Sequence, residues 1–117
     1  MDLKSFLTEL LAALANIDII KDIDLKSEGI TLSGRIILSD KMFMEVYHNE
    51  VTATTAFALI KEGKRIWGID KDSVRNWHIH PLNNPEQHEP IQSMAIFDII
   101  ECLKNVLDSL MAEDALK

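Results

Sequence analysis

The sequence has few of the residues that constrain or interrupt a chain. One cysteine, three prolines and four glycines occur in 117 residues, so the fold must stand without a disulfide framework or a proline-rich repeat. No hydrophobic run approaches the roughly 18 residues of a membrane-spanning helix. The N-terminus, with acidic Asp2 and Glu9, is unlike a signal peptide. We therefore expect a cytoplasmic protein with no membrane segment.

Apolar residues, by contrast, are abundant. They make up 47% of the chain against 26% charged residues, which is typical of a globular protein and excludes a disordered one. A chain of this length buries roughly two thirds of the surface that its unfolded form exposes. We expect one domain spanning residues 1–117, with Cys102 as a small buried side chain in a helix.

The spacing of the apolar residues predicts the order of the elements. Helical spacing over residues 3–16, after Asp2 as the N-cap, predicts an amphipathic helix, and the same spacing over residues 91–112 predicts a second. Alternation between them predicts five strands joined by short turns. Those strands are residues 19–25, 30–38, 42–47, 52–60 and 65–70.

This order predicts the fold class. Strands joined by short turns run antiparallel, and a sheet with one apolar face needs helices to cover it. We expect a single two-layer α+β domain, with a mainly antiparallel five-stranded sheet packed on one face by the N- and C-terminal helices. The sequence has no glycine-rich phosphate loop, CxxC pair or serine nucleophile elbow, which argues against dinucleotide enzymes, P-loop enzymes and zinc ribbons.

Three of the four histidines lie within eleven residues: His78, His80 and His88. In an extended backbone the spacing of His78 and His80 puts both rings on one face, with Cα atoms roughly 6 to 7 Å apart. Pro81 should end that strand, and the turn at residues 83–85 can bring His88 back toward the pair. Because histidine acts as base, acid or metal ligand near neutral pH, the cluster points to chemistry.

Charged residues near the histidines add to this prediction. Asp70, Glu86 and Glu89 can each supply a carboxylate, as a ligand or as an orienting acceptor. Residues 61–80 carry five basic against three acidic groups, whereas the chain as a whole has a net charge of −7. This basic island could hold one or two phosphates, although a charged hairpin in solvent explains it equally well.

The runs at residues 64–70, 77–81 and 85–90 resemble the TumE-like toxins of prokaryotic toxin–antitoxin pairs. In that family a strand ending in an aspartate precedes a histidine- and proline-rich turn and a closing helix. The chain departs from the pattern at Lys71, where an asparagine is common, and in a longer spacer to the histidines. The resemblance implies a toxin that acts on RNA or its translation and is neutralised by a small antitoxin protein. The matching positions are Arg65, Asp70, His78, His80 and His88.

Three functions fit these residues. In the first, His78 and His80 cleave RNA without metal as acid and base, and Arg65 or Arg75 stabilises the charge on phosphorus. In the second, the same histidines, with His88 as a further candidate ligand and with Asp70 or a nearby glutamate, hold zinc or manganese to activate water. In the third, the histidine loop is structural and the acidic surface binds a basic partner. We assign His78, His80, His88 and Asp70 as candidate catalytic residues, and Arg65, Arg75 and Lys71 as candidate substrate-binding residues.

Two expectations concern stability and assembly. If the histidines are partly exposed loop residues, His78→Ala and His80→Ala should abolish activity and leave the melting temperature nearly unchanged. Methionines at positions 42, 44, 94 and 111 could form an adaptable apolar face, from which we expect a homodimer.

Overall fold

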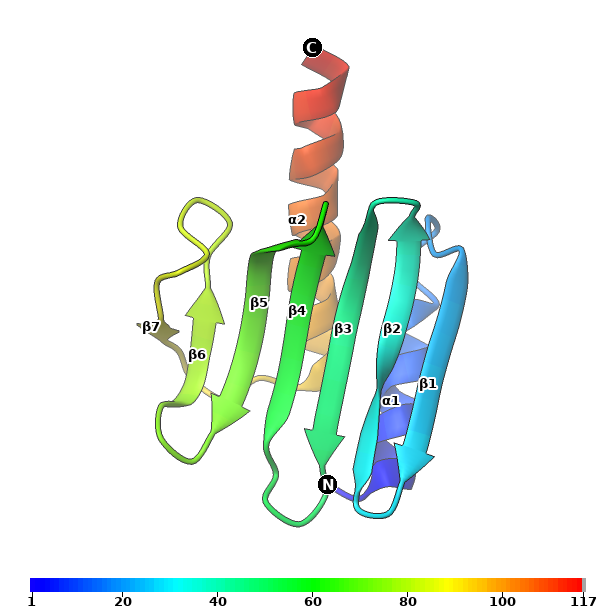
Figure 1. Cartoon of the computed structure of the whole chain (residues 1–117), viewed down its shortest axis with the longest axis vertical. Helices are drawn as coiled ribbons and strands as arrows, with labels where there is room; N and C mark the ends of the chain where they lie inside the picture. The colour runs from blue at the N-terminus through cyan, green and yellow to red at the C-terminus, as the bar shows by residue number, and fades with distance from the viewer. Residues whose placement is uncertain (117) are drawn as a thin grey trace.

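A computed structural model describes residues 1–116, and across them seven strands form one antiparallel sheet. The spatial order of the strands follows their order in the sequence (Figure 1). Each strand pairs with the next through a short connection, which forces the antiparallel arrangement. The strands are β1 (Asp22–Glu28), β2 (Thr31–Ser39), β3 (Met42–Asn49), β4 (Thr55–Lys61), β5 (Lys64–Asp72), β6 (Asn76–His80) and β7 (Glu89–Pro90).

Two helices, α1 (Leu3–Leu14) and α2 (Ile96–Leu116), cover one face of the sheet (Figure 1). The predicted N-cap is confirmed, because Asp2 Oδ1 accepts a hydrogen bond of 2.7 Å from the Ser5 amide. The second helix begins later than the pattern predicted. The Ile91 amide donates to the Trp77 carbonyl and holds that segment extended alongside β6. The face of the sheet turned away from both helices is called the open face below.

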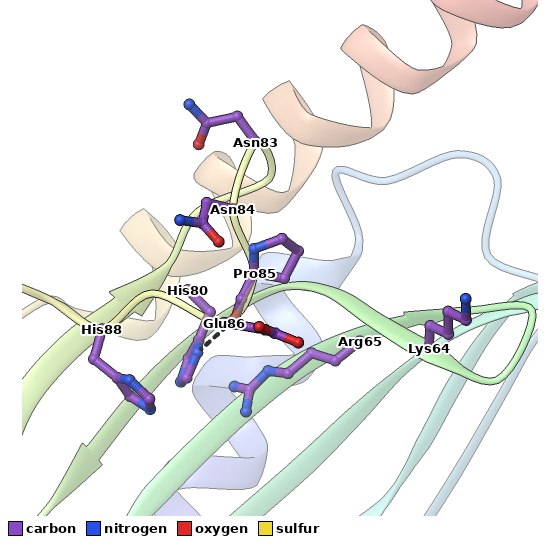
Figure 2. Close-up of a pocket in the computed structure, with 8 residues that line it drawn as sticks. All are labelled: Lys64, Arg65, His80, Asn83, Asn84, Pro85, Glu86 and His88. Carbon is purple, nitrogen blue, oxygen red and sulfur yellow. Dashed lines mark hydrogen bonds between the residues drawn. The ribbon is translucent and has the colours of Figure 1, made fainter.

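The α+β architecture is confirmed, but the prediction of five strands is wrong by two. β6, predicted as an extended segment that ends at Pro81, pairs with β5 beyond the turn at residues 73–75. β7 contains only Glu89 and Pro90, which pair with Ile79 and His78. A strand of two residues has no alternation for a sequence pattern to reveal. The loop of residues 81–88 between these strands is shown in Figure 2.

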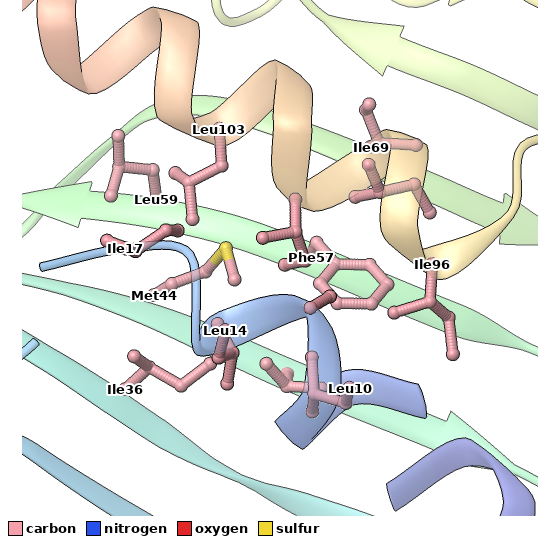
Figure 3. Packing of buried hydrophobic residues seen from close by; sticks show 14 of the residues in the cluster. Leu10, Leu14, Ile17, Ile36, Met44, Phe57, Leu59, Ile69, Ile96 and Leu103 are labelled. Atoms are coloured by element: carbon pink, nitrogen blue, oxygen red, sulfur yellow. The ribbon is translucent and has the colours of Figure 1, made fainter. Parts of the chain in front are cut away.

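The hydrophobic core lies between the helices and the sheet (Figure 3). Phe57 and Met44 from the sheet and Leu10 and Leu103 from the helices are fully buried there. Alternation along each strand sends the neighbouring side chains to the open face. Core packing therefore fixes which residues of β5 and β6 face away from the helices.

Burial weakens the basis for a methionine-rich contact face. Met44 is fully buried, Met42 and Met94 pack against the core, and only Met111 of these four is largely exposed. Gap-filling in the core explains the three buried methionines. The homodimer stays a prediction that a measurement of mass in solution can check.

Two further sequence expectations concern Cys102 and the membrane. Cys102 is half-buried against the core, and burial, reinforced by Asp98 and Glu101, raises the pKa of its thiol. Among the described residues, neither helix is both long and apolar enough to cross a membrane.

Candidate functional site

The open face carries a cluster of three imidazoles and one carboxylate. Asp70 on β5 is the direct cross-strand partner of His78 on β6, and Gly68 is the partner of His80. Since residues two apart share a face, this register brings Asp70, His78 and His80 together. The i, i+2 spacing on an extended segment, predicted from the sequence, is thus confirmed.

His88 joins the pair from the loop that precedes β7. Its ring centroid lies 4.5 Å from that of His80 and 5.5 Å from that of His78. One ring nitrogen of each histidine can be chosen so that all three lie within 4.8 Å of one another. The predicted return of the chain at residues 83–85 is therefore confirmed. His78, His80, His88 and Asp70 are called the histidine centre below.

One carboxylate oxygen ties the centre together. Asp70 Oδ2 lies 3.2 Å from His80 Nε2, 3.6 Å from His78 Nε2 and 2.9 Å from Arg65 Nη2. The other oxygen, Asp70 Oδ1, is buried without a hydrogen-bond partner, as is Arg65 Nε. Unpaired buried polar atoms are rare in folded proteins, and they are often found where a ligand or ion binds.

Gly68 makes room for Arg65. The arginine side chain passes over position 68 to reach Asp70, so a Cβ atom there would collide with its guanidinium group. It would also lie 2.6 Å from the Phe57 carbonyl oxygen, which belongs to the neighbouring strand. A glycine inside a strand often marks such a close approach.

We predict that Gly68→Ala displaces Arg65 from Asp70 and lowers the free energy of unfolding by about 1 to 3 kcal/mol, because overpacking forces the strands to shift. Urea denaturation measures the loss. Gly29→Asn is the control, since position 29 has a φ of +60°, which asparagine tolerates, and open space around it. Equal stability of Gly68→Ala and the wild type would contradict the prediction.

Hydrogen bonds fix the orientation of two rings. His78 Nδ1 lies 2.9 Å from the Asn76 carbonyl oxygen, and His80 Nδ1 lies 3.0 Å from the Pro85 carbonyl oxygen. A carbonyl only accepts, so each Nδ1 must carry the hydrogen and donate it. Both Nε2 atoms therefore face Asp70 with either a lone pair or a second proton. The first form can bind a metal ion, and the second can donate a proton.

Burial corrects one expectation from the sequence. His78 and His80 are 3% and 5% exposed, so they are interior strand residues rather than partly exposed loop residues. Alanine at either position would leave a cavity and an unpaired carbonyl, and the melting temperature would not stay unchanged. His88 alone of the three is exposed.

Electrostatics keep His88 neutral. Desolvation lowers the pKa of its imidazole, and the positive charge of Arg75 and the neighbouring histidines act in the same direction. Its lone pair is therefore available near neutral pH. This effect also shows that Arg75, on the turn before β6, lies close enough for its charge to reach the centre.

A cleft of about 700 Å³ opens onto the centre. The side chains of His80, His88 and Arg65 converge on it from β6, the loop and β5 (Figure 2). Lys64 and Glu86 stand on its wall, so Glu86 is the second carboxylate nearest the histidines. The remaining lining residues are Asn83, Asn84 and Pro85.

Not every predicted residue reaches the centre. Lys71 follows Asp70 and so points to the other face of the sheet, where it lies beside Trp77 and Thr55. Glu89, in register with Ile79, likewise faces away from the His88 side of its strand. Lys64 was not predicted, although it stands next to Arg65 in the basic stretch. The adjacency of the two cations was the available signal.

The fourth histidine is structural. His48 is buried against Phe6 at a centroid distance of 4.2 Å, and its nitrogens contact the Thr55 hydroxyl and the Met1 carbonyl at 2.8 Å each. It thus provides a buried histidine outside the centre for comparison.

Searches of protein family models, curated proteins and solved structures found no match to this chain. The resemblance to TumE-like toxins stays a prediction drawn from its motif, and the chemistry has to be argued from the geometry.

Proposed function

We propose that this chain cleaves RNA phosphodiester bonds at the histidine centre and serves as the toxin of a prokaryotic toxin–antitoxin pair. The observation that carries the proposal is the convergence of three imidazoles, Asp70 and Arg65 beside one cleft. Imidazoles supply proton transfer or metal binding, and an arginine supplies charge for a phosphate. The motif that resembles TumE-like toxins includes all five of these residues, which supports RNA as the substrate.

Arg65 and Lys64 are the residues that would hold the phosphate. Both line the cleft, and the Arg65 guanidinium lies at the edge of the centre because of its contact with Asp70. Arg75 adds positive charge from the turn before β6. Since the chain is acidic in total, this arrangement favours local binding of one or two phosphates over broad electrostatic capture of nucleic acid.

The proposed reaction is transesterification. The ribose 2′-oxygen forms a bond to phosphorus, the bond from phosphorus to the 5′-oxygen breaks, and a 2′,3′-cyclic phosphate results. One proton leaves the 2′-hydroxyl and one reaches the departing 5′-oxygen, so the reaction consumes nothing else. The centre must supply both transfers, either through a neutral and a protonated imidazole or through a water held on a metal ion.

The open face supports a single-stranded substrate. Beyond the centre it forms a shelf of about 320 Å³, with Ala56 and Ala58 in its floor. Tyr47 stands at its side, and its cross-strand neighbours, Ser33 and Ala56, are small. An uncovered aromatic ring on a sheet is a surface on which unpaired bases stack. Ala58 pairs with Gly68, so the shelf adjoins the site of cleavage.

We predict that His88→Ala lowers the rate of RNA cleavage by about 100- to 10,000-fold, which is the range that one proton-transfer group supplies. Because the side chain is exposed, the free energy of unfolding should change by less than about 0.5 kcal/mol. The measurement is cleavage of a 5′-labelled single-stranded RNA oligonucleotide by the purified chain. The same oligonucleotide annealed to its complement should be cut more slowly.

Gln87→Ala is the matched control, since position 87 is the exposed neighbour of His88 in the same loop. Its cleavage rate should equal that of the wild type. Full activity of His88→Ala would remove His88 from the mechanism. Absence of RNA cleavage by the wild type would favour the interaction module instead.

The toxin assignment has its own test. Expression of the wild-type chain in bacteria should arrest growth, expression of His88→Ala should not, and a short open reading frame next to the gene should encode a protein that restores growth. If no adjacent frame rescues growth, the antitoxin partner is wrong even if the chain cleaves RNA.

A further inference from the structure

We infer that His78, His80, His88 and Asp70 bind a single Zn²⁺ ion, with a coordination position left open to the cleft. The ion binding stands on geometry alone. Only the role of the ion in catalysis rests on the proposed cleavage of RNA.

The spacing of the ligand atoms fits one ion. Donor atoms about 2.0 to 2.1 Å from a tetrahedral zinc lie roughly 3.3 Å from one another. Asp70 Oδ2 lies 3.2 Å from His80 Nε2 and 3.6 Å from His78 Nε2. The third imidazole has a ring nitrogen within 4.8 Å of the other two. His88 is exposed, so its side chain is free to make the small movement that brings it to the ion.

The orientation of the rings fits as well. Histidines that bind metals almost always donate their second ring nitrogen to a carbonyl or carboxylate, which fixes the ring and makes the ligand more basic. His78 and His80 both do this through Nδ1, with the Asn76 and Pro85 carbonyls as acceptors. Two Nε2 atoms are therefore presented in parallel toward the same point.

Charge balance favours a cation at that point. If both rings are neutral, their Nε2 lone pairs face the carboxylate oxygen and repel it. If both are protonated, two imidazolium groups and Arg65 surround one carboxylate in a largely buried space, which is unfavourable. A divalent ion attracts both lone pairs and the carboxylate, and the unpartnered Asp70 Oδ1 gives it a second oxygen.

The ligand set selects the metal. Three imidazoles and one carboxylate suit zinc, whereas magnesium, calcium and manganese prefer oxygen ligands. Catalytic zinc sites keep one position for water or substrate, and the ligand facing the cleft here is the exposed His88. Zinc makes its bound water acidic near neutral pH. The bound hydroxide would take the proton of the 2′-hydroxyl, and the resulting water would return it to the departing 5′-oxygen.

The experiment is a calorimetric titration of the untagged, chelator-treated full chain with Zn²⁺, supported by the visible spectrum of the Co²⁺ form. We expect saturation at one ion per chain and a Co²⁺ spectrum typical of low coordination number. His88→Ala should weaken Zn²⁺ binding by at least about 10- to 100-fold, since even the loss of an outer-shell partner has an effect of that size.

Three variants act as controls. Gln87→Ala, His48→Gln and Cys102→Ala should all still bind one ion, which would exclude the loop as such, the buried structural histidine and the lone thiol as the site. Absence of saturable binding at one ion per chain, or equal affinity in the wild type and His88→Ala, would overturn the inference.

The outcomes for the metal and for RNA cleavage are separable. Zinc binding at the centre without RNA cleavage would support the metal site and remove the proposed function. RNA cleavage that persists in chelator, by protein that binds no zinc, would overturn the metal site and leave proton transfer by imidazoles as the mechanism.

Discussion

His80→Ala should abolish RNA cleavage and also lower the free energy of unfolding by about 1 to 3 kcal/mol. His80 is buried, and its Nδ1 donates to the Pro85 carbonyl, so alanine leaves a cavity and an unpaired acceptor. Its Nε2 contacts Asp70, which makes it part of the centre. Chemistry and packing thus depend on the same ring. Cleavage and urea denaturation of the same preparation measure the two effects.

Two further variants separate these effects. His80→Asn places an amide nitrogen near the position of Nδ1 but nothing at Nε2, so we expect it to recover stability without recovering activity. His48→Ala removes an equally buried histidine outside the centre, and it should lose stability while the folded fraction keeps the full rate. Full cleavage by His80→Ala, or a folded but inactive His48→Ala, would contradict the assignment of the centre.

The sequence predicted the positions of the histidines better than their environment. The spacing of His78 and His80, with Pro81 after them, is a local pattern, and local patterns determine which face of a strand a side chain occupies. Burial of these rings depends on the return of the loop and on β7, which are contacts between distant residues. A polar, proline-punctuated segment therefore predicted exposed loop histidines where the structure has buried ones.

The same limit applies to the charged residues. Arg65 and Lys71 both lie in the basic stretch, and nothing in their composition distinguishes them. The difference lies in the register of β5, where the bulge opposite Leu59 and Ile60 changes the alternation before Trp67. Arg65 then shares the face of Asp70, whereas Lys71 does not. The space that Gly68 leaves for the guanidinium is a three-dimensional property that a glycine in a strand pattern only hints at.

Asp70→Ala should lower the free energy of unfolding of zinc-free protein by about 2 to 3 kcal/mol, and it should also weaken zinc binding and RNA cleavage. The carboxylate is the counterion of Arg65 at 2.9 Å, and the two side chains are 15% and 32% exposed. Removing one partner of a buried pair leaves the other charge uncompensated, with losses of about 3 to 5 kcal/mol when burial is complete. Partial exposure of Arg65 reduces the expected value.

The sign of a second substitution tests this explanation. If the loss in Asp70→Ala comes from an unpaired guanidinium, then adding Arg65→Met should restore part of the stability, because the double variant holds no uncompensated cation. Urea denaturation of the wild type, both single variants and the double variant, all in the presence of chelator, gives the coupling free energy. A double variant less stable than Asp70→Ala would mean that packing by the arginine stem outweighs its charge. Asp70 would then act mainly as a ligand of the centre rather than as the counterion that anchors Arg65.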